Sequence, residues 1–486
     1  MRRYTLAIAF TLSIICLVGT VHGQGSEWNG LSALHPVDSI PIEFPPITVL
    51  SSHNPSEGTL FLSNFTYLGN QYGRFLIALD KSGNAVFKQS TEPFGAYDFR
   101  LQPNGLYTYF DNFTSKFYGL DSHYVKVDSF SAVHGYETDY RELTVRPDGR
   151  YAVIAIERRH VNMRTIVSDG DSNALVLVPI IQVFDKSHNL LFEWKSIDSG
   201  HFAITDATHE TLSGGTIDCV HANSIDFEGD TALLFSSRNM DEVTKIDART
   251  GTIVWRLGGK NNQFTFTNDT VPISHQHDVR RLPNGNITIF DNGNYRKGRK
   301  PYSRVVEYAL NEIAKTATKV WEYRHTPDVY TSAMGSAERL PSGNTLVGWG
   351  LSDSLTATEV TPSGSTALEI HLPSGHYIYR IQKSIDPHFR FGAVAGTTNS
   401  RTYIGANYPN PFALTTVVPF TLERESPVTL EIVNALGRRV RLLYQGILER
   451  GDYSVPLAGE TLTSGMYLCR LVTNDGSFAR MISVIK

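Results

Sequence analysis

The chain has 486 residues, of which 41% are hydrophobic and 19% charged, and its formal net charge is -4. This composition is that of a globular protein longer than one ordinary domain, and it excludes an intrinsically disordered chain. The slightly acidic balance offers no broad basic surface, so we expect neither nucleic acid nor an anionic membrane surface as a partner.

Residues 1–23 have the pattern of a secretory signal peptide. Met1 and two arginines precede an apolar run, and small residues near Gly23 predict cleavage after that residue. Cys16 leaves a lipoprotein open as an alternative, although Ile15 before it is too large for a usual lipid-attachment site. No second apolar run is long enough to span a bilayer, so we expect export without a transmembrane segment.

After a polar, proline-rich lead-in over residues 24–46, a turn pattern recurs in which a small polar residue precedes glycine. Glycine supplies the positive φ that such turns need, and proline presets the backbone before it, so each pattern predicts a hairpin. The turns lie at residues 80–83, 102–105, 146–149, 247–251, 282–285 and 340–343.

These hairpins are of two alternating kinds. An Asp-rich turn leads into an aromatic strand, and a Pro-x-Gly turn leads into an aliphatic one, so that two hairpins make one four-stranded antiparallel sheet. No amphipathic helices separate the hairpins. Such repetition predicts a β-propeller over residues 47–390.

A second domain follows a linker of small and polar residues at 391–402. Residues 403–486 contain short strands of alternating pattern, which predict a small Ig-like β-sandwich. Only Cys219 and Cys469 remain after cleavage, far apart in the chain, so we expect no structural disulfide. Cys219 near His221 could be a metal ligand or a nucleophile, but a small buried apolar residue is the better interpretation.

Residues 218–294 are dense in polar groups. Successive side chains on a strand alternate between faces, so we expect His221 and Asn223 to share one face. Arg238 comes directly after an apolar strand, at a sheet end where side chains reach outward. His277 is expected on a turn of its own.

The motifs of this stretch resemble those of the bacterial arylsulfate sulfotransferases. The resemblance covers residues 47–383 and implies a six-bladed β-propeller that moves sulfuryl groups between phenols through a histidine. The fold class we expect is therefore all-β, a six-bladed β-propeller followed by the sandwich. The motifs are His221-x-Asn223, Ser-x-Arg238, the turn from Trp255 to Gly259, Gln276-His277-Asp278 and Phe290-Asp291-Asn292-Gly293.

By this resemblance His277 is the nucleophile of a ping-pong reaction and forms a sulfohistidine. Arg238 binds the sulfuryl oxygens, Asn223 adds an uncharged donor, and His221 is first general acid and then general base. A neutral imidazole can be both nucleophile and leaving group. A small aromatic sulfate is the expected donor and a phenol the acceptor. The donor carries the activated group, so no metal, nucleotide or other cofactor is required.

Two further residues, Arg141 and His275, are predicted to bind substrate. Arg141-Glu142 stands where the family has a histidine followed by an acid. Arginine cannot exchange a proton near neutrality, so this departure bears on rate and substrate more than on binding.

Other interpretations remain open. The three imidazoles of His221, His275 and His277 could hold zinc or copper, although the nearest carboxylate, Asp278, is expected to point away. The propeller could also be catalytically weak and act as an extracellular binding or surface module, which Arg141 favours and the retained histidines disfavour.

The tail resembles the C-terminal sorting domains of type IX secretion, through Tyr408-Pro409-Asn410-Pro411-Phe412 and Ser464-Gly465-Met466-Tyr467. This resemblance implies an outer-membrane secretion machinery as partner, and a secreted or cell-surface location after export through the periplasm. The alternative, a carbohydrate-binding or adhesive sandwich, is less favoured because the stretch has no exposed aromatic triplet.

Overall fold

The computed structural model describes residues 44–67, 72–92, 94–122, 124–296, 300–384, 402–405, 407, 410–434, 438–459 and 462–485. The expected signal peptide, the lead-in as far as residue 43 and the linker as far as residue 401 lie outside these residues. Strands dominate the described chain, which also contains three short 3-10 helices. These are η1 (Met163–Thr165), η2 (Ile204–Asp206) and η3 (Arg238–Met240).

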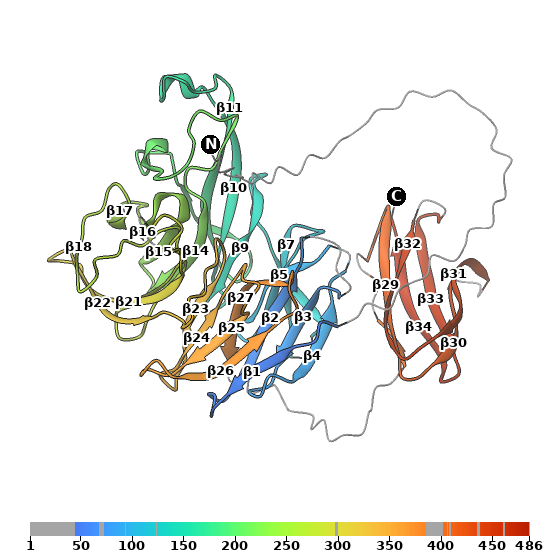
Figure 1. The fold of residues 1–486 in the computed structure, drawn as a ribbon. Helices are drawn as coiled ribbons and strands as arrows, with labels where there is room; N and C mark the ends of the chain where they lie inside the picture. The colour runs from blue at the N-terminus through green and yellow to red at the C-terminus, as the bar shows by residue number, and fades with distance from the viewer. Residues whose placement is uncertain are drawn as a thin grey trace, which may run out of the picture. The chain divides into compact units, whose positions relative to one another are not determined.

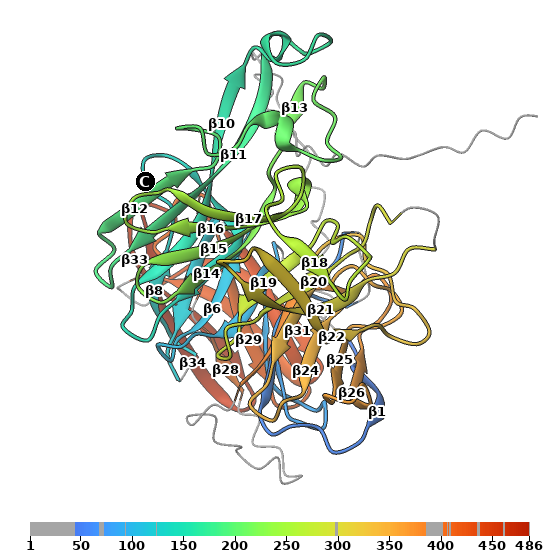
Figure 2. The ribbon, with the colours of Figure 1, turned by 90° about the vertical axis from the view of Figure 1, so that its left-hand side faces the viewer.

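Between residues 44 and 384 the described strands form six sheets of four or five strands, in which consecutive strands pair antiparallel (Figures 1 and 2). The first sheet contains β27 (Tyr377–Ser384), β2 (Thr59–Phe65), β3 (Phe75–Leu79) and β4 (Ala85–Ser90). The second contains β5 (Ala96–Leu101), β6 (Tyr107–Asp111), β7 (Lys116–Leu120) and β8 (Lys126–Phe130). The third contains β9 (Glu137–Val145), β10 (Tyr151–Val161), β11 (Ala174–Phe184) and β12 (Leu190–Lys195), with β13 (Thr216–Ile217) parallel to β11.

The remaining three sheets follow the same order. The fourth contains β14 (Ala222–Glu228), β15 (Ala232–Ser237), β16 (Glu242–Asp247) and β17 (Ile253–Gly258). The fifth contains β19 (His277–Arg281), β20 (Ile287–Asp291), β21 (Arg304–Asn311) and β22 (Thr316–Tyr323), with β18 (Thr265–Thr267) parallel to β22. The sixth contains β23 (Ser336–Arg339), β24 (Thr345–Gly348), β25 (Ala357–Val360) and β26 (Thr366–His371), and β1 (Thr48–Ser52) pairs antiparallel with β26.

The first strands of the six sheets contact one another in a closed ring. β5 contacts β9, β9 contacts β14, β14 contacts β19, β19 contacts β23, β23 contacts β27, and β27 contacts β5. β27 also pairs with β2, which joins the two ends of this part of the chain in one sheet. A ring of sheets of this kind is propeller-like.

The hairpin turns expected from the sequence are present. The glycines that close them have φ between +77° and +89°, the left-handed region where a Cβ would be strained. Pro-x-Gly turns join the first and second strands of a sheet, as in β5–β6 and β23–β24, and Asp-rich turns join the third and fourth, as in β3–β4 and β16–β17. The prediction that two hairpins make one four-stranded sheet is confirmed for five of the six sheets, whereas in the sheet of β27, β2, β3 and β4 the strand β27 comes from the other end of the ring.

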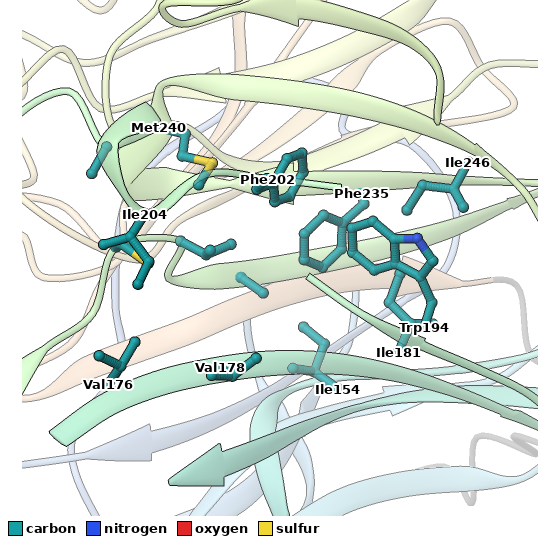
Figure 3. Close-up of a cluster of buried hydrophobic side chains, with 14 of the residues drawn as sticks. Ile154, Val176, Val178, Ile181, Trp194, Phe202, Ile204, Phe235, Met240 and Ile246 are labelled. Carbon is teal, nitrogen blue, oxygen red and sulfur yellow. The ribbon is translucent and has the colours of Figure 1, made fainter. Parts of the chain in front are cut away.

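A large apolar cluster fills the space between the third and fourth sheets. Ile154, Ile181, Trp194, Phe235 and Ile246 converge there from strands of both sheets (Figure 3). Ile217, Cys219 and Val220 belong to the same cluster and are fully buried. The segment that leads into β14 is thus anchored by its apolar side chains.

The C-terminal residues form two sheets with one shared core, a β-sandwich. One sheet contains β28 (Tyr403–Ile404), β29 (Thr415–Leu422) and β32 (Gly451–Ala458); the other contains β31 (Arg439–Leu448), β30 (Ser426–Val433), β33 (Gly465–Thr473) and β34 (Gly476–Val484). Val418, Leu430 and Leu471 pack together between them. Cys469 lies in this core and Cys219 does not, and both are free thiols, as expected. No helix in the described part of the chain is long and apolar enough to cross a membrane.

The separate cores predict that the tail is dispensable for folding of the ring of sheets. A chain of residues 24–395 keeps β27 and every cluster that packs around the ring, so its thermal midpoint should lie within about 2–4 °C of the matching transition in residues 24–486. Differential scanning calorimetry measures both. A chain that ends at residue 376 is the control, because it loses β27 and should unfold without a cooperative transition. Aggregation of the 24–395 chain would contradict independence.

Candidate functional site

The site residues lie where several first strands begin. His221 comes directly before β14, and Asn223 lies in that strand. Arg238 begins η3 immediately after β15, and His277 begins β19. Arg238 therefore lies at a sheet end, as predicted, whereas His277 begins a strand and not a separate turn.

The expected alternation between His221 and Asn223 is not present. His221 has φ +52°, in the left-handed region, and the strand begins only at Ala222. Ala222 and Asn223 are both buried. The left-handed residue turns the chain before the strand, so the orientation of His221 is set by this turn and not by strand periodicity.

His277 is almost fully buried, with 3% of its surface exposed. Its Nδ1 lies 2.7 Å from Oδ1 of Asn292, and its Nε2 accepts a hydrogen bond from the backbone N–H of Met334 at 3.2 Å. Nε2 therefore carries a lone pair, and the proton is on Nδ1, where it is donated to Asn292. Burial and the nearby guanidinium of Arg238 hold the pKa of His277 well below 6.5. The imidazole is neutral at pH 7.

Among the described residues, Arg238 contacts oxygens of neutral groups. Its Nη1 donates to Oδ1 of Asn239 at 2.8 Å and its Nη2 to the carbonyl of Ser332 at 3.2 Å, while Nε has no partner. None of the described carboxylates forms an ion pair with it. Burial is the main reason that its pKa falls to about 10, and Asp218 and Arg141 act on it in opposite directions. A guanidinium in this state offers its charge to an anion.

The segment from Thr331 to Met334 connects His277 and Arg238. Asn292 donates to the carbonyls of Thr331 and Met334, each at 3.0 Å, and so holds this segment against the nucleophile candidate. Ser332 accepts from Arg238 within the same segment. Sequence reasoning quoted Asn292 within a family motif but gave it no role.

Asn223 is oriented by the neighbouring first strand. Its Nδ2 donates to the carbonyl of Gln276 at 2.7 Å, and its buried Oδ1 has no partner. Gln276 in turn donates to the carbonyl of Glu242 and to Ser236. One of the two amide N–H groups expected to face substrate is thus used within the protein.

Arg141 lies in β9, where the pairing with β10 is irregular. It forms an ion pair with Asp139, Nη1 to Oδ2 at 2.5 Å, and lies over the ring of Tyr140. Its charge helps to lower the pKa of His221 and of His277, so the structure brings Arg141 near both imidazoles. Arginine in place of the expected histidine therefore adds positive charge to this site.

His275 is positioned differently from the other candidates. Its ring lies 3.2 Å from Asp241, which also contacts His209, and the ring of Tyr295 stacks on His209 at 3.6 Å. The backbone carbonyl oxygen of His275 lies 3.2 Å from Nδ1 of His277. The predicted substrate contact of His275 stays a prediction. The described residues contain no group of three or more histidine, cysteine, aspartate and glutamate side chains placed to hold a metal ion.

An aromatic cluster borders the site and was missed by sequence reasoning. Tyr97 and Tyr140 stack at 4.6 Å, and Tyr379 packs edge-on against Tyr140 at 5.5 Å. Phe65 and Met334 belong to the same cluster, and Met334 is the residue whose N–H binds His277. These residues come from three different sheets and from the loop before β23, so no local pattern connects them.

Comparison with known proteins gives two family matches. Residues 48–380 match the family model of the arylsulfotransferases, and residues 406–485 match that of a secretion system C-terminal sorting domain. The chain is also 36% identical over 95 residues to the arylsulfate sulfotransferase AssT of Escherichia coli O6:H1. That alignment covers 18% of this chain and 14% of the relative, so it spans a small part of either protein.

Similar solved structures have low sequence identity. A protein of unknown function from Bacteroides caccae is 11% identical, with a TM-score of 0.41, over 68% of this chain and 99% of that one. A catalytically inactive virginiamycin B lyase from Staphylococcus aureus with quinupristin is 8% identical, with a TM-score of 0.36, over 67% of this chain and 88% of that one.

The buried neutral state of His277 predicts a loss of stability in acid. The unfolded chain binds a proton near pH 6.5 and the folded chain does not, so lowering the pH below about 6.5 favours unfolding. Between pH 7 and pH 5, His277 should account for about 1–2 kcal/mol of lost stability. Urea unfolding at the two pH values should therefore give a smaller loss in His277→Asn.

The control is His160→Asn, which replaces an exposed imidazole and should keep the full loss. Equal losses in the wild type and in His277→Asn would mean that His277 is charged in the folded protein at pH 5.

Proposed function

This chain belongs to the arylsulfotransferase family, and on that premise we propose that it moves a sulfuryl group from a phenolic sulfate ester to a phenolic acceptor. The transfer is ping-pong, without a nucleotide, and passes through a sulfohistidine at His277. The observation that carries the proposal is a neutral, buried imidazole with its lone pair on Nε2, together with the charge of the Arg238 guanidinium, which forms no ion pair with any described carboxylate.

His277 acts as the nucleophile. In the first half-reaction Nε2 forms a bond to sulfur, the bond from sulfur to the phenolic oxygen breaks, and its electron pair leaves with the phenolate. Asn292 supports this direction of attack, because its Oδ1 accepts the Nδ1 proton and keeps the lone pair on Nε2. The N–H of Met334 must release Nε2 for attack, and can then donate to a sulfuryl oxygen.

Arg238 and Arg141 bind the sulfuryl group. Two permanent positive charges near the imidazoles favour a sulfate ester, which is anionic, and stabilise charge on its oxygens as the bond to phenolate breaks. The partnerless Nε of Arg238 is a donor ready for such an oxygen. Arg141 shares its charge with Asp139, so Arg238 is the stronger contact.

The aromatic cluster favours an aryl group on the substrate. Tyr97, Tyr140 and Phe65 offer ring faces and edges next to the segment that contacts His277. Offset and edge-on packing of rings adds to the burial of apolar surface, and this geometry suits a phenol better than an aliphatic alcohol.

His221 exchanges protons with the phenols. Burial and the charge of Arg141 lower its pKa to about 4, so in the free protein it is neutral and a proton acceptor. It therefore serves the second half-reaction, where it takes the proton of the attacking phenol. In the first half-reaction an acidic phenol leaves as phenolate with little need of a proton.

The same proposal extends to the other parts of the chain. The ring of sheets is a six-bladed β-propeller over residues 47–390, and the sandwich of residues 403–486 is Ig-like and directs secretion through an outer-membrane machinery. Residues 1–23 act as the signal peptide for the first export step. The enzyme is then secreted or held at the cell surface.

The covalent intermediate is directly testable. With an aryl sulfate donor alone, intact-mass spectrometry should find one added sulfuryl group on the wild type and none on His277→Ala. Addition of a phenol should remove the group and release an aryl sulfate. A wild-type protein that binds the donor but never gains the group would favour the alternative function, an extracellular binding module. The Arg141–Asp139 ion pair is consistent with that alternative, because it uses part of the arginine's charge within the protein.

Arg141 should tune the choice of donor. Its replacement in Arg141→His removes a permanent charge beside His221, raises the pKa of that imidazole and lets it protonate the leaving phenolate. Turnover should then rise most for the least acidic phenols, up to about 10²-fold, while donor affinity falls. The measurement is kcat and KM across phenyl sulfates of graded leaving-group pKa, with Arg141→Lys as the variant that keeps the charge. Equal effects across the series would place Arg141 outside the chemistry.

A further inference from the structure

We propose that Asp218 is a positioning residue that fixes the proton of His221 on Nδ1 and directs its Nε2 to the substrate, an inference that rests on the proposed function. Asn239 connects this pair to Arg238, so that the base and the sulfuryl-binding guanidinium are held by one hydrogen-bonded chain. Neither Asp218 nor Asn239 belongs to the motifs that identify the family in this sequence.

The carboxylate of Asp218 contacts His221 twice. Oδ2 lies 2.5 Å from Nδ1 of the imidazole, and Oδ1 accepts the backbone N–H of His221 at 3.0 Å. An ionised carboxylate only accepts, so Nδ1 must carry the proton and Nε2 the lone pair. The backbone contact also stabilises the left-handed φ of His221, which an imidazole-bearing residue adopts at a cost.

The segment that carries Asp218 is itself fixed. β13, which ends at Ile217, pairs with β11, and Cys219 and Val220 are fully buried in the cluster between the third and fourth sheets. Asp218 is therefore a polar residue between apolar anchors on both sides. Its carboxylate faces His221 because the neighbouring side chains are held in the core.

Asn239 joins the two functional groups through its amide. Nδ2 donates to the carbonyl of Asp218 at 2.6 Å, and Oδ1 accepts from Nη1 of Arg238 at 2.8 Å. The backbone of Asn239 is held from both sides, since its N–H donates to Val220 and its carbonyl accepts from Thr208. A displacement of Asp218 would thus also displace Arg238.

The charges that face His221 give Asp218 its electrostatic role. Arg141 in β9 and Arg238 in η3 both lower the pKa of His221, whereas His277 in β19 is neutral. Asp218 is the charged group that opposes them at His221. When an attacking phenol gives its proton to Nε2, an imidazolium forms, and Asp218 balances its charge. The bond from sulfur to His277 breaks in that step, its electron pair returns to Nε2 of His277, and the proton later passes to solvent.

The test compares Asp218→Asn with the wild type in the second half-reaction. Sulfurylated protein is mixed with a phenol, and the rate of loss of the sulfuryl group is followed by intact mass between pH 3 and pH 9, a range that includes the acid limb set by His221. We expect at least a 10-fold slower transfer to phenols of high pKa and an acid limb moved to lower pH. A merely structural role would lower the rate at every pH without moving the limb.

Glu210→Gln is the matched control. Glu210 accepts from Nδ2 of Asn239 at 3.4 Å and from the backbone of Asp218, and neither of these contacts involves His221. Its removal perturbs the same segment and should leave the acid limb in place. An acid limb that moves equally in both variants, or in neither, overturns the inference.

A second measurement does not depend on transfer. Nitrogen-15 NMR of the imidazoles, with the His221 signals assigned by their absence in His221→Gln, should find the proton on Nδ1 in the wild type and a mixture of tautomers in Asp218→Ala. A proton on Nε2 of wild-type His221 overturns the inference, whatever the activity. Conversely, a wild type that transfers no sulfuryl group while His221 has the expected tautomer contradicts the proposed function and leaves the Asp218 contact intact.

Discussion

One buried carboxylate connects the first strands on which the whole site is built. Glu142 has no exposed surface, and it accepts hydrogen bonds from Arg100 at 2.5 Å, Arg280 at 2.8 Å and Arg380 at 2.9 Å. These arginines come from β5, β19 and β27, and Glu142 itself from β9. Burial raises the pKa of Glu142, but the three guanidiniums together lower it by more than burial raises it, so that the pKa is about 2. Removal of Glu142 would leave several charges buried without a partner, which is far more destabilising than loss of a surface ion pair.

This ionic network extends to the nucleophile candidate. Arg280 and Arg380 both contact Oδ1 of Asp278, the residue after His277, and Oδ2 of Asp278 accepts the N–H of Ala337 in β23. Arg380 also donates to the carbonyl of Asn223 at 2.7 Å. Asp278 has a left-handed φ of +51°, which its neighbours hold in place. The position of His277 thus depends on charges that lie outside the reaction.

The sequence predicts what is local and repeated. Turn glycines and alternating strands identify the hairpins, their order and the position of Arg238 at a strand end, because each depends on a few adjacent residues. The sequence pattern predicts His277 on a separate turn, and it does not predict the start of β19 at this residue. The pairing of β27 with β2 joins strands from opposite ends of residues 44–384, so no local sequence pattern predicts it. For the same reason, the sequence did not predict the irregular pairing around Glu142. Nor did it predict the aromatic cluster of Tyr97, Tyr140 and Tyr379. Asp218 had a weak local signal, an acid three residues before His221, which strand periodicity alone could not interpret.

The charges of this site set two requirements against each other. On the proposed function, the arginines that hold an anionic sulfuryl group also lower the pKa of nearby imidazoles, which keeps His277 neutral and nucleophilic but makes His221 a poor acid. A histidine in place of Arg141 would relax that conflict, because it could carry charge when the donor is bound and lose it afterwards. Arg141 keeps its charge throughout, so in the proposed reaction His221 depends more on Asp218, the described carboxylate that contacts it. If the proposed function holds, a donor anion that binds between the arginines cancels part of their field and so raises the pKa of His221 while the donor is bound. In that case substrate binding and the protonation of His221 are coupled through electrostatics.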